Sequence, residues 1–169
     1  MTAARQQRKR SLLGGLFGGL LLGMALAGAI SPLSLWAATE NQLAVNSNTG
    51  LAISGFDPVA YFTEGKALFG QAEFELNLDG VVWRFCNEGN LGAFAVHPEV
   101  YTPRFGGYDP VAISHGRSVP GHPLIWDVTG QRLYLFYSEK SRAAFRADTG
   151  RVIDTAERKW PEVARSLGE

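Results

Sequence analysis

Residues 55–60 read Gly-Phe-Asp-Pro-Val-Ala, and residues 107–112 repeat this stretch as Gly-Tyr-Asp-Pro-Val-Ala, 52 positions later. A match across six positions indicates an internal duplication and not a chance recurrence. The segments that follow the two copies also match in their pattern of apolar residues and turn signals. We therefore expect the fold to consist of two copies of one structural unit.

The segment after each copy has the pattern of a β-hairpin followed by a short helix. In the first copy, residues 72–78 alternate between apolar and polar side chains and residues 81–86 return as the second strand. Between them, Asp79-Gly80 is a two-residue turn signal. Asn87 is expected to cap the helix that follows, as Ser138 is in the second copy.

The second copy predicts the same elements with a one-residue difference in spacing. Its strands are expected over 124–128 and 132–137, with a turn at Thr129-Gly130. Phe145 on the following helix matches Phe94 at a distance of 51 and not 52 positions. The two copies are therefore expected to differ by one residue in a turn.

These patterns place the domain in the α+β class, as two tandem β-hairpin–helix repeats packed as one small domain with a C-terminal helix. Neither hairpin alone would be stable in water, so the copies are expected to bury each other. We place repeat one at about 55–105 and repeat two at about 107–150, within a domain covering 51–169. Gly150 is a predicted helix stop, and the last helix is expected over 154–167.

Residues 1–38 have the composition of an export signal. Basic residues without any acid are followed by an uncharged run at 12–38, and Lys-Arg-Ser-Leu-Leu at 9–13 resembles a twin-arginine signal with Lys in the first place. An uncleaved membrane anchor is the alternative, because the run exceeds the ~20 residues that span a bilayer. We expect a periplasmic or exported protein that meets the membrane only through this segment, with a polar leader at 39–50.

Charge and motif content exclude several classes of function. Beyond residue 38 the chain carries 12 basic and 16 acidic residues, interspersed at helical spacing, which is typical of a solvated face and not of a nucleic-acid-binding surface. The sequence contains no nucleophile elbow, phosphate loop, dinucleotide fingerprint or zinc-protease motif, so no enzyme is indicated. Cys86 is the only cysteine, which rules out an intrachain disulfide.

Three motifs in a fixed order resemble the exported YHS-domain proteins. They are Gly-Phe-Asp-Pro-Val-Ala-Tyr-Phe at 55–62, Trp-Arg-Phe-Cys-Asn-Glu at 83–88 and His-Pro-Glu-Val-Tyr-x-Pro at 97–103. The resemblance covers roughly 51–160. It implies a small domain related to treble-clef and zinc-ribbon modules, with a metal-binding role in the cysteine-rich members.

The chain departs from this family at the metal ligands. No second cysteine follows Cys86 at short spacing, and Asp109 stands where exported members often have a cysteine. His115 and His122, seven positions apart in a Gly/Pro-rich loop at 114–123, are the best remaining ligands. The metal hypothesis is a zinc or copper site drawn from Cys86, Asp109, His115 and His122, with Asp57 or Glu99 as alternative oxygen donors. The alternative is a pair of exposed loop histidines and a buried cysteine.

Three further groups have both a structural and a functional interpretation. Cys86 precedes a helix N-terminus, where N–H groups can stabilise a thiolate. Asp57 and Asp109 precede prolines, so each carboxylate is expected to accept hydrogen bonds from the next turn, unless both meet in one pocket for acid–base chemistry. The rings at 101, 105 and 108 are expected either to line a small pocket or to fill the core; they are Tyr101, Phe105 and Tyr108.

The leading function is a small binding module with weak transition-metal binding. The alternative is a metal-free, degenerate domain that serves as an accessory or interaction protein and meets an unidentified protein partner through the aromatic surface at 101–108. A small enzyme is a third hypothesis, which requires Asp57, Asp109 and Cys86 to share a pocket.

Overall fold

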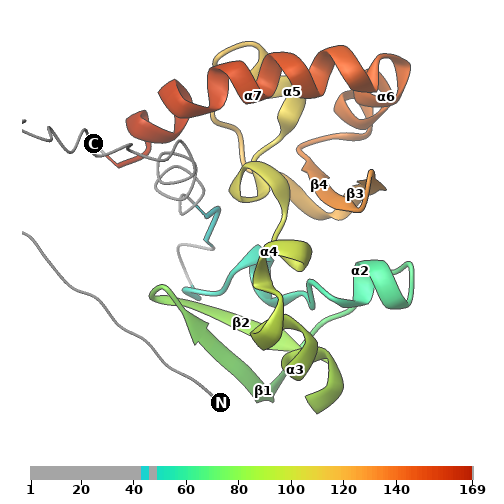
Figure 1. The fold of residues 1–169 in the computed structure, drawn as a ribbon, viewed down its shortest axis with the longest axis vertical. Helices are drawn as coiled ribbons and strands as arrows, with labels where there is room; N and C mark the ends of the chain where they lie inside the picture. Colours follow the sequence, from blue (N-terminus) through green and yellow to red (C-terminus); the bar gives the residue numbers. More distant parts are fainter. Residues whose placement is uncertain (1–42, 46–48, 169) are drawn as a thin grey trace, which may run out of the picture. The chain divides into compact units, whose positions relative to one another are not determined.

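Each copy of the repeated motif opens one half of the fold (Figure 1). The computed structural model describes residues 43–45 and 49–168, all within one compact unit, so the predicted export segment at 1–38 lies outside the described residues. In both halves a 3-10 turn and a short helix precede a hairpin, and helices follow it. The elements are η1 (Ile53–Gly55), α2 (Ala60–Thr63), β1 (Gln71–Leu78), β2 (Val81–Phe85), α3 (Glu88–Val96), α4 (Pro98–Tyr101), η2 (Arg104–Gly107), α5 (Pro110–Ser114), β3 (His122–Thr129), β4 (Arg132–Phe136), α6 (Glu139–Ala147) and α7 (Thr149–Ser166).

Two separate antiparallel hairpins confirm the predicted α+β class (Figure 1). β1 pairs with β2, and β3 pairs with β4. Each hairpin closes in a two-residue turn with positive φ, at Asp79-Gly80 in the first and at Gly130-Gln131 in the second. The second turn lies one residue later than the predicted Thr129-Gly130, because Thr129 still pairs with Arg132 at the end of β3.

Each sheet carries an irregularity at the same place, next to a glycine that has no room for a side chain. The pairing of β1 with β2 shifts after Gln71, and that of β3 with β4 shifts after His122. A Cβ atom would lie 2.4 Å from the partner strand at Gly70 and 2.5 Å from it at Gly121. Only glycine therefore fits where the two backbones approach.

A left-handed turn precedes each Asp-Pro motif, and no pattern in the sequence predicted it. φ is positive at all three residues of η1 and at 105–107 in η2. Positive φ is uncommon for β-branched and bulky residues such as Ile53 and Phe105, and it persists here because both side chains are buried in the core. The shared backbone conformation extends the duplication beyond the matching residues.

Both repeats build their cores from the same three aromatic positions. In repeat one, Phe94 of α3 packs on Trp83 and Phe85 of β2, with ring centroids 4.8 Å and 5.2 Å apart. In repeat two, the equivalent rings of α6 and β4 pack with centroids 5.0 Å and 5.1 Å apart. These apolar contacts hold each helix against its own hairpin.

Strand β4 joins the two cores because both of its faces are buried. Leu133 and Leu135 belong to the core of repeat one, whereas Tyr134 and Phe136 belong to the core of repeat two. All four side chains are at most 3% exposed. The two copies therefore share one strand and bury each other.

The C-terminal helix α7 begins five residues earlier than the predicted 154–167. Asp148 caps it by accepting a hydrogen bond from the backbone N–H of Arg151 at 3.4 Å. Gly150 consequently lies inside the helix, and the predicted stop there is wrong. A good N-cap two residues upstream outweighs the low helix propensity of one glycine.

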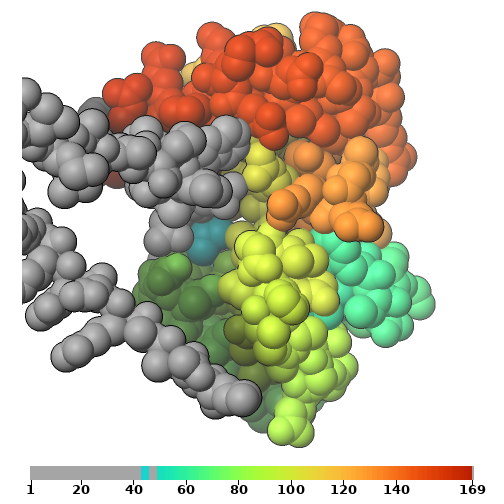
Figure 2. Space-filling model, in the orientation of Figure 1, coloured from blue at the N-terminus to red at the C-terminus, as the bar shows by residue number. Residues whose placement is uncertain are grey.

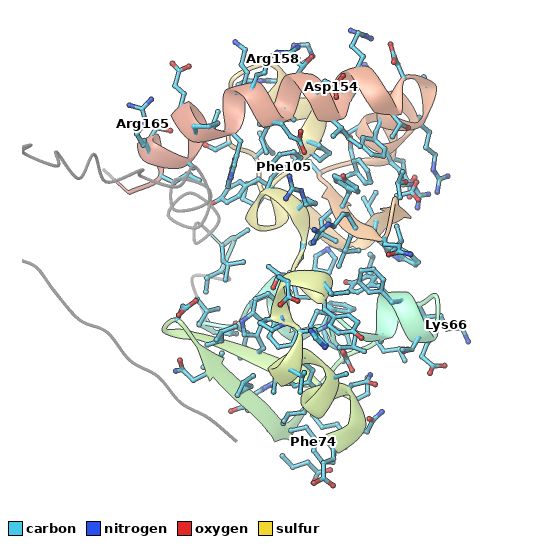
Figure 3. The ribbon with its side chains drawn as sticks, in the orientation of Figure 1. Lys66, Phe74, Phe105, Asp154, Arg158 and Arg165 are labelled. Carbon is cyan, nitrogen blue, oxygen red and sulfur yellow. The ribbon has the colours of Figure 1, made fainter. Side chains whose placement is uncertain are left out.

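One face of α7 packs on repeat two and the other is exposed. Figure 2 shows the helix lying across this repeat, and Figure 3 shows Phe105 on its inner side and Arg158 on its outer side. Trp160 supplies the inner contact, with its ring centroid 5.7 Å from that of Phe105. Among the described helices, none combines the length and apolar character needed to span a membrane.

Alanine substitutions at two glycines of repeat one test this packing. Gly70→Ala is expected to lower the free energy of unfolding by about 1–3 kcal/mol, because the new Cβ overlaps the backbone of β2. Gly92→Ala, inside α3 with no atom within 4 Å of a new Cβ, is expected to raise it by about 0.5–1 kcal/mol. Urea unfolding of the full-length proteins measures both changes, and equal stability of the two variants would contradict the close approach at Gly70.

Candidate functional site

The buried carboxylate of Asp57 accepts four hydrogen bonds from three segments of repeat one. Its Oδ1 atom accepts from the backbone N–H groups of Val59 at 2.8 Å and Ala60 at 3.3 Å. Its Oδ2 atom accepts from the backbone N–H of Cys86 at 2.8 Å and from the side-chain amide of Asn90 at 2.6 Å. The predicted role of the aspartate in capping the next turn is confirmed, and the same carboxylate also ties α2 to β2 and α3.

Asp109 is buried in the same way in repeat two, but it accepts only three hydrogen bonds. Oδ1 accepts from the N–H groups of Val111 at 2.8 Å and Ala112 at 3.3 Å. Oδ2 accepts from the N–H of Tyr137 at 2.9 Å. Ser141 occupies the position of the fourth donor, and within the described chain its hydroxyl makes no hydrogen bond to this carboxylate.

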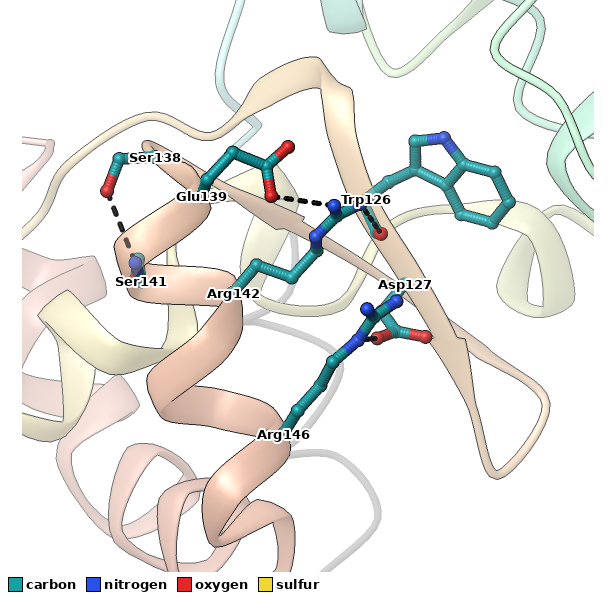
Figure 4. Close-up of polar contacts among 7 residues, drawn as sticks. All are labelled: Trp126, Asp127, Ser138, Glu139, Ser141, Arg142 and Arg146. Atoms are coloured by element: carbon teal, nitrogen blue, oxygen red, sulfur yellow. Dashed lines mark hydrogen bonds and ion pairs between the residues drawn. The ribbon is translucent and has the colours of Figure 1, made fainter.

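The missing donor results from a single residue difference between otherwise equivalent helix N-termini: Ser141 stands where repeat one has Asn90. Asn87 caps α3 by accepting from the N–H of Asn90 at 2.9 Å, and Ser138 caps α6 by accepting from the N–H of Ser141 at 3.2 Å (Figure 4). Both predicted caps are confirmed. The side chain of Asn90 is long enough to reach back to Asp57, whereas the serine is shorter. Ser141 had no pattern of its own in the sequence, but alignment of the repeats at 51 positions reveals the exchange.

A pocket of about 600 Å³ lies beside Asp109, and we call it the Asp109 pocket. α5 and the loop after it form one side, and the first turns of α6 form the other. Much of its lining is apolar, from the side chains of Val111, Ala112, Val119 and Ala144. The open acceptor position of Asp109 therefore occurs at a cavity whose size lies within the range of small-molecule sites.

Two basic side chains that line the Asp109 pocket have no acidic partner among the described residues. Lys140 and Arg117 are exposed and form no ion pair there. Arg142 and Arg146 of α6, by contrast, are each paired with a carboxylate at 2.6 Å (Figure 4). The pocket thus combines one buried carboxylate with uncompensated positive charge, a combination that the sequence analysis did not identify.

The four residues of the metal hypothesis are not brought together. His115 is the C-cap of α5 and lines the Asp109 pocket, but His122 is the first residue of β3 and Cys86 lies at the end of β2 in repeat one. The predicted loop at 114–123 is therefore wrong at both ends. Over the described ranges, no group of three or more His, Cys, Asp or Glu side chains is placed to hold a metal ion.

Cys86 is half-buried at the end of β2, with its backbone N–H on the Asp57 carboxylate. Burial and the neighbouring Asp57 carboxylate raise the pKa of the Cys86 thiol to about 11. The Sγ atom lies 3.4 Å from the backbone carbonyl oxygen of Phe69, to which the thiol can donate. Burial first, and then the charge of Asp57, disfavour the thiolate that a helix N-terminus can stabilise.

The three aromatic residues predicted to line a pocket are divided between the two cores. Tyr101 packs against Phe62, with ring centroids 5.5 Å apart, at the edge of the core of repeat one. Phe105 and Tyr108 both pack on Trp160 in repeat two, at 5.7 Å and 6.1 Å. All three rings take part in core packing, and Phe105 also lines the smaller cleft described next, as the pocket prediction expects.

A second and smaller cleft, of about 170 Å³, is lined by residues of both repeats. It includes Trp83, which is 1% exposed and whose indole N–H has no hydrogen-bond partner among the described residues. Of the two arginines in its described lining, Arg104 is paired with Glu157 at 2.9 Å and Arg132 donates to the backbone carbonyl of Glu99 at 2.6 Å. Because these arginines already have partners and this cleft is smaller, the Asp109 pocket is the better candidate site.

Exchanging the fourth donor tests its contribution to stability. Asn90→Ser is expected to lower the free energy of unfolding by about 1.5–3 kcal/mol, because it removes a hydrogen bond to a buried carboxylate. Ser141→Ala is the matched control and is expected to change stability by less than about 0.5 kcal/mol, since no side-chain bond to Asp109 is lost. Chemical denaturation measures both; similar losses in the two variants would contradict the difference between the repeats.

The pH dependence of alkylation tests the environment of Cys86. Thiolate is the reactive form, so iodoacetamide labelling of the native protein is expected to be slow at neutral pH and to accelerate up to a midpoint of about pH 11. The urea-unfolded chain is the control and should show a midpoint at about 8.5. Mass spectrometry follows this single cysteine, and a native midpoint below that of the unfolded chain would disprove the assignment.

Comparison with known proteins gives no identity for the chain: no model of a protein family, no curated protein and no solved structure matches it. The resemblance to exported YHS-domain proteins is therefore carried by the sequence motifs alone and stays a prediction.

Proposed function

We propose that this domain is a metal-free binding module whose ligand occupies the Asp109 pocket. One observation carries the proposal. The Asn90 amide completes the hydrogen bonds of Asp57 in repeat one, whereas in repeat two Asp109 has an open acceptor position beside a cavity of about 600 Å³. A buried carboxylate is more stable when its remaining acceptor positions are filled, and a ligand with a donor group can fill this one.

The positions of the candidate metal ligands support the metal-free alternative over metal binding. Asp109 and His115 line one pocket in repeat two, but neither Cys86 nor His122 lines it. The Oδ1 atom of Asp109 already accepts two backbone hydrogen bonds. A zinc site needs about four converging ligands, and two at this pocket do not make one.

The surroundings of the reactive groups support a binding role over an enzymatic one. Burial and the neighbouring Asp57 carboxylate raise the pKa of the Cys86 thiol, which suppresses the nucleophilic form at neutral pH. The carboxylates of Asp57 and Asp109 each accept hydrogen bonds from backbone groups of their own repeat, so they form no acid–base pair. In our proposal the protein is an accessory module and not a catalyst.

The proposed location is outside the cytoplasm. The basic and then uncharged composition of residues 1–38 supports export, and the motifs at 55–62, 83–88 and 97–103 support a YHS-like domain behind it. The runner-up contact surface at 101–108 receives less support, because Phe105 is 4% exposed and Tyr101 and Tyr108 are half-buried.

Two substitutions of Ser141 test the binding function. Ser141→Asn introduces the donor that repeat one already has and fills part of the pocket, whereas Ser141→Ala leaves the pocket open. In a thermal-shift screen of small organic acids, amines, sugars and neutral compounds, we expect ligands that raise the Tm of wild type and Ser141→Ala but not of Ser141→Asn. A ligand at 100 times its Kd should add about 2.7 kcal/mol of stability.

Two results would contradict this function. One is a screen in which no compound distinguishes Ser141→Asn from Ser141→Ala. The other is elemental analysis that finds near-stoichiometric zinc or copper in the wild type and none in the His115→Ala/His122→Ala double variant, since this would restore the metal hypothesis.

A further inference from the structure

We infer that the ligand of the Asp109 pocket is a small carboxylic acid that also carries an amino or hydroxyl donor and an apolar side chain. This inference depends on the proposed function and names its ligand class. The donor bonds Asp109, the carboxylate faces Lys140 and Arg117, and the apolar group packs against the aliphatic lining.

The donor requirement follows from the comparison of the two repeats. In repeat one, an N–H group of Asn90 lies 2.6 Å from Oδ2 of the buried aspartate. In repeat two, Oδ2 of Asp109 accepts only the N–H of Tyr137, and Asp109 lines the pocket. An ammonium or hydroxyl group of the ligand can take the place of the missing amide. A ligand without a donor would leave the acceptor position unfilled and displace water from it.

The requirement for negative charge follows from the cations around the pocket. Lys140 and Arg117 line it without an acidic partner in the described chain. The nearby Glu139 is paired with an arginine at 2.6 Å and does not offset them. These side chains are exposed, so their attraction for an anion should weaken as salt is added.

The apolar requirement follows from the rest of the lining. Val111, Ala112, Val119 and Ala144 present aliphatic surface, and Tyr137 presents an aromatic ring. The volume of about 600 Å³ exceeds what an acid of two or three carbons would fill. An amino or hydroxy acid with a side chain of phenylalanine size would bury this surface.

Four probes with the same aromatic group separate the donor requirement from the carboxylate requirement: L-phenylalanine, phenyllactate, 3-phenylpropionate and phenethylamine. The first two carry both a donor and a carboxylate, the third lacks the donor, and the fourth lacks the carboxylate. Calorimetric titration into the full-length protein should give a Kd at least ~10-fold lower for one of the first two than for either of the others. Which of the two binds better distinguishes an ammonium donor from a hydroxyl donor.

Three variants, at two positions, locate each interaction within the pocket. Ser141→Asn should abolish binding of the preferred acid, while Ser141→Ala should keep it. Lys140→Gln should weaken that acid by about 3–10-fold at low salt and reduce its salt dependence, without changing its preference over 3-phenylpropionate.

The outcomes distinguish this inference from the proposed function. Equal binding of 3-phenylpropionate and phenyllactate would overturn the donor requirement, and equal binding of phenethylamine and phenylalanine would overturn the carboxylate requirement. If no probe binds while another compound still distinguishes Ser141→Asn from Ser141→Ala, the ligand class is wrong and the binding function stands. If no compound of any class distinguishes the two variants, both are wrong.

Discussion

A buried carboxylate placed before a proline is the interaction on which the rest of each repeat depends. Asp57 is fully buried and accepts hydrogen bonds from the turn that follows it, from the end of β2 and from α3. A charge removed from water is tolerated only when hydrogen bonds compensate it, so the donors must converge on one point. This requirement fixes how the short helix, the hairpin and the longer helix meet.

The parts of the fold that could be predicted are those with local chemical causes. The duplicated motif, the alternation in the strands, and the capping residues Asn87 and Ser138 each reflect contacts between near neighbours in sequence. The left-handed turns had no such cause, since Ile53 and Phe105 adopt positive φ only because tertiary packing holds their side chains. The start of α7 differs from the prediction because Gly150 has the pattern of a helix stop, whereas the cap at Asp148 begins the helix before it.

The candidate site was predicted only in part, because its properties depend on differences between the copies. Asp109 and His115 were identified from residue type, and both line the pocket. Cys86 and His122 were identified on the same basis and lie elsewhere, since residue type does not reveal which strand or helix end places a side chain. Asp57 accepts four hydrogen bonds, whereas Asp109 accepts three and lines a cavity. Comparison of the two copies makes this difference visible.

Because both faces of β4 are buried, the core of repeat one can be completed only after β4 has been synthesised. Repeat one is synthesised first, yet Leu133 and Leu135, which belong to its core, come from near the end of repeat two. During synthesis the first half therefore exposes apolar surface until 48 further residues have been added beyond β2, counted from Phe85 to Leu133. A nascent or truncated chain that ends before β4 lacks Leu133 and Leu135. The core of repeat one, although synthesised first, is then the incomplete one.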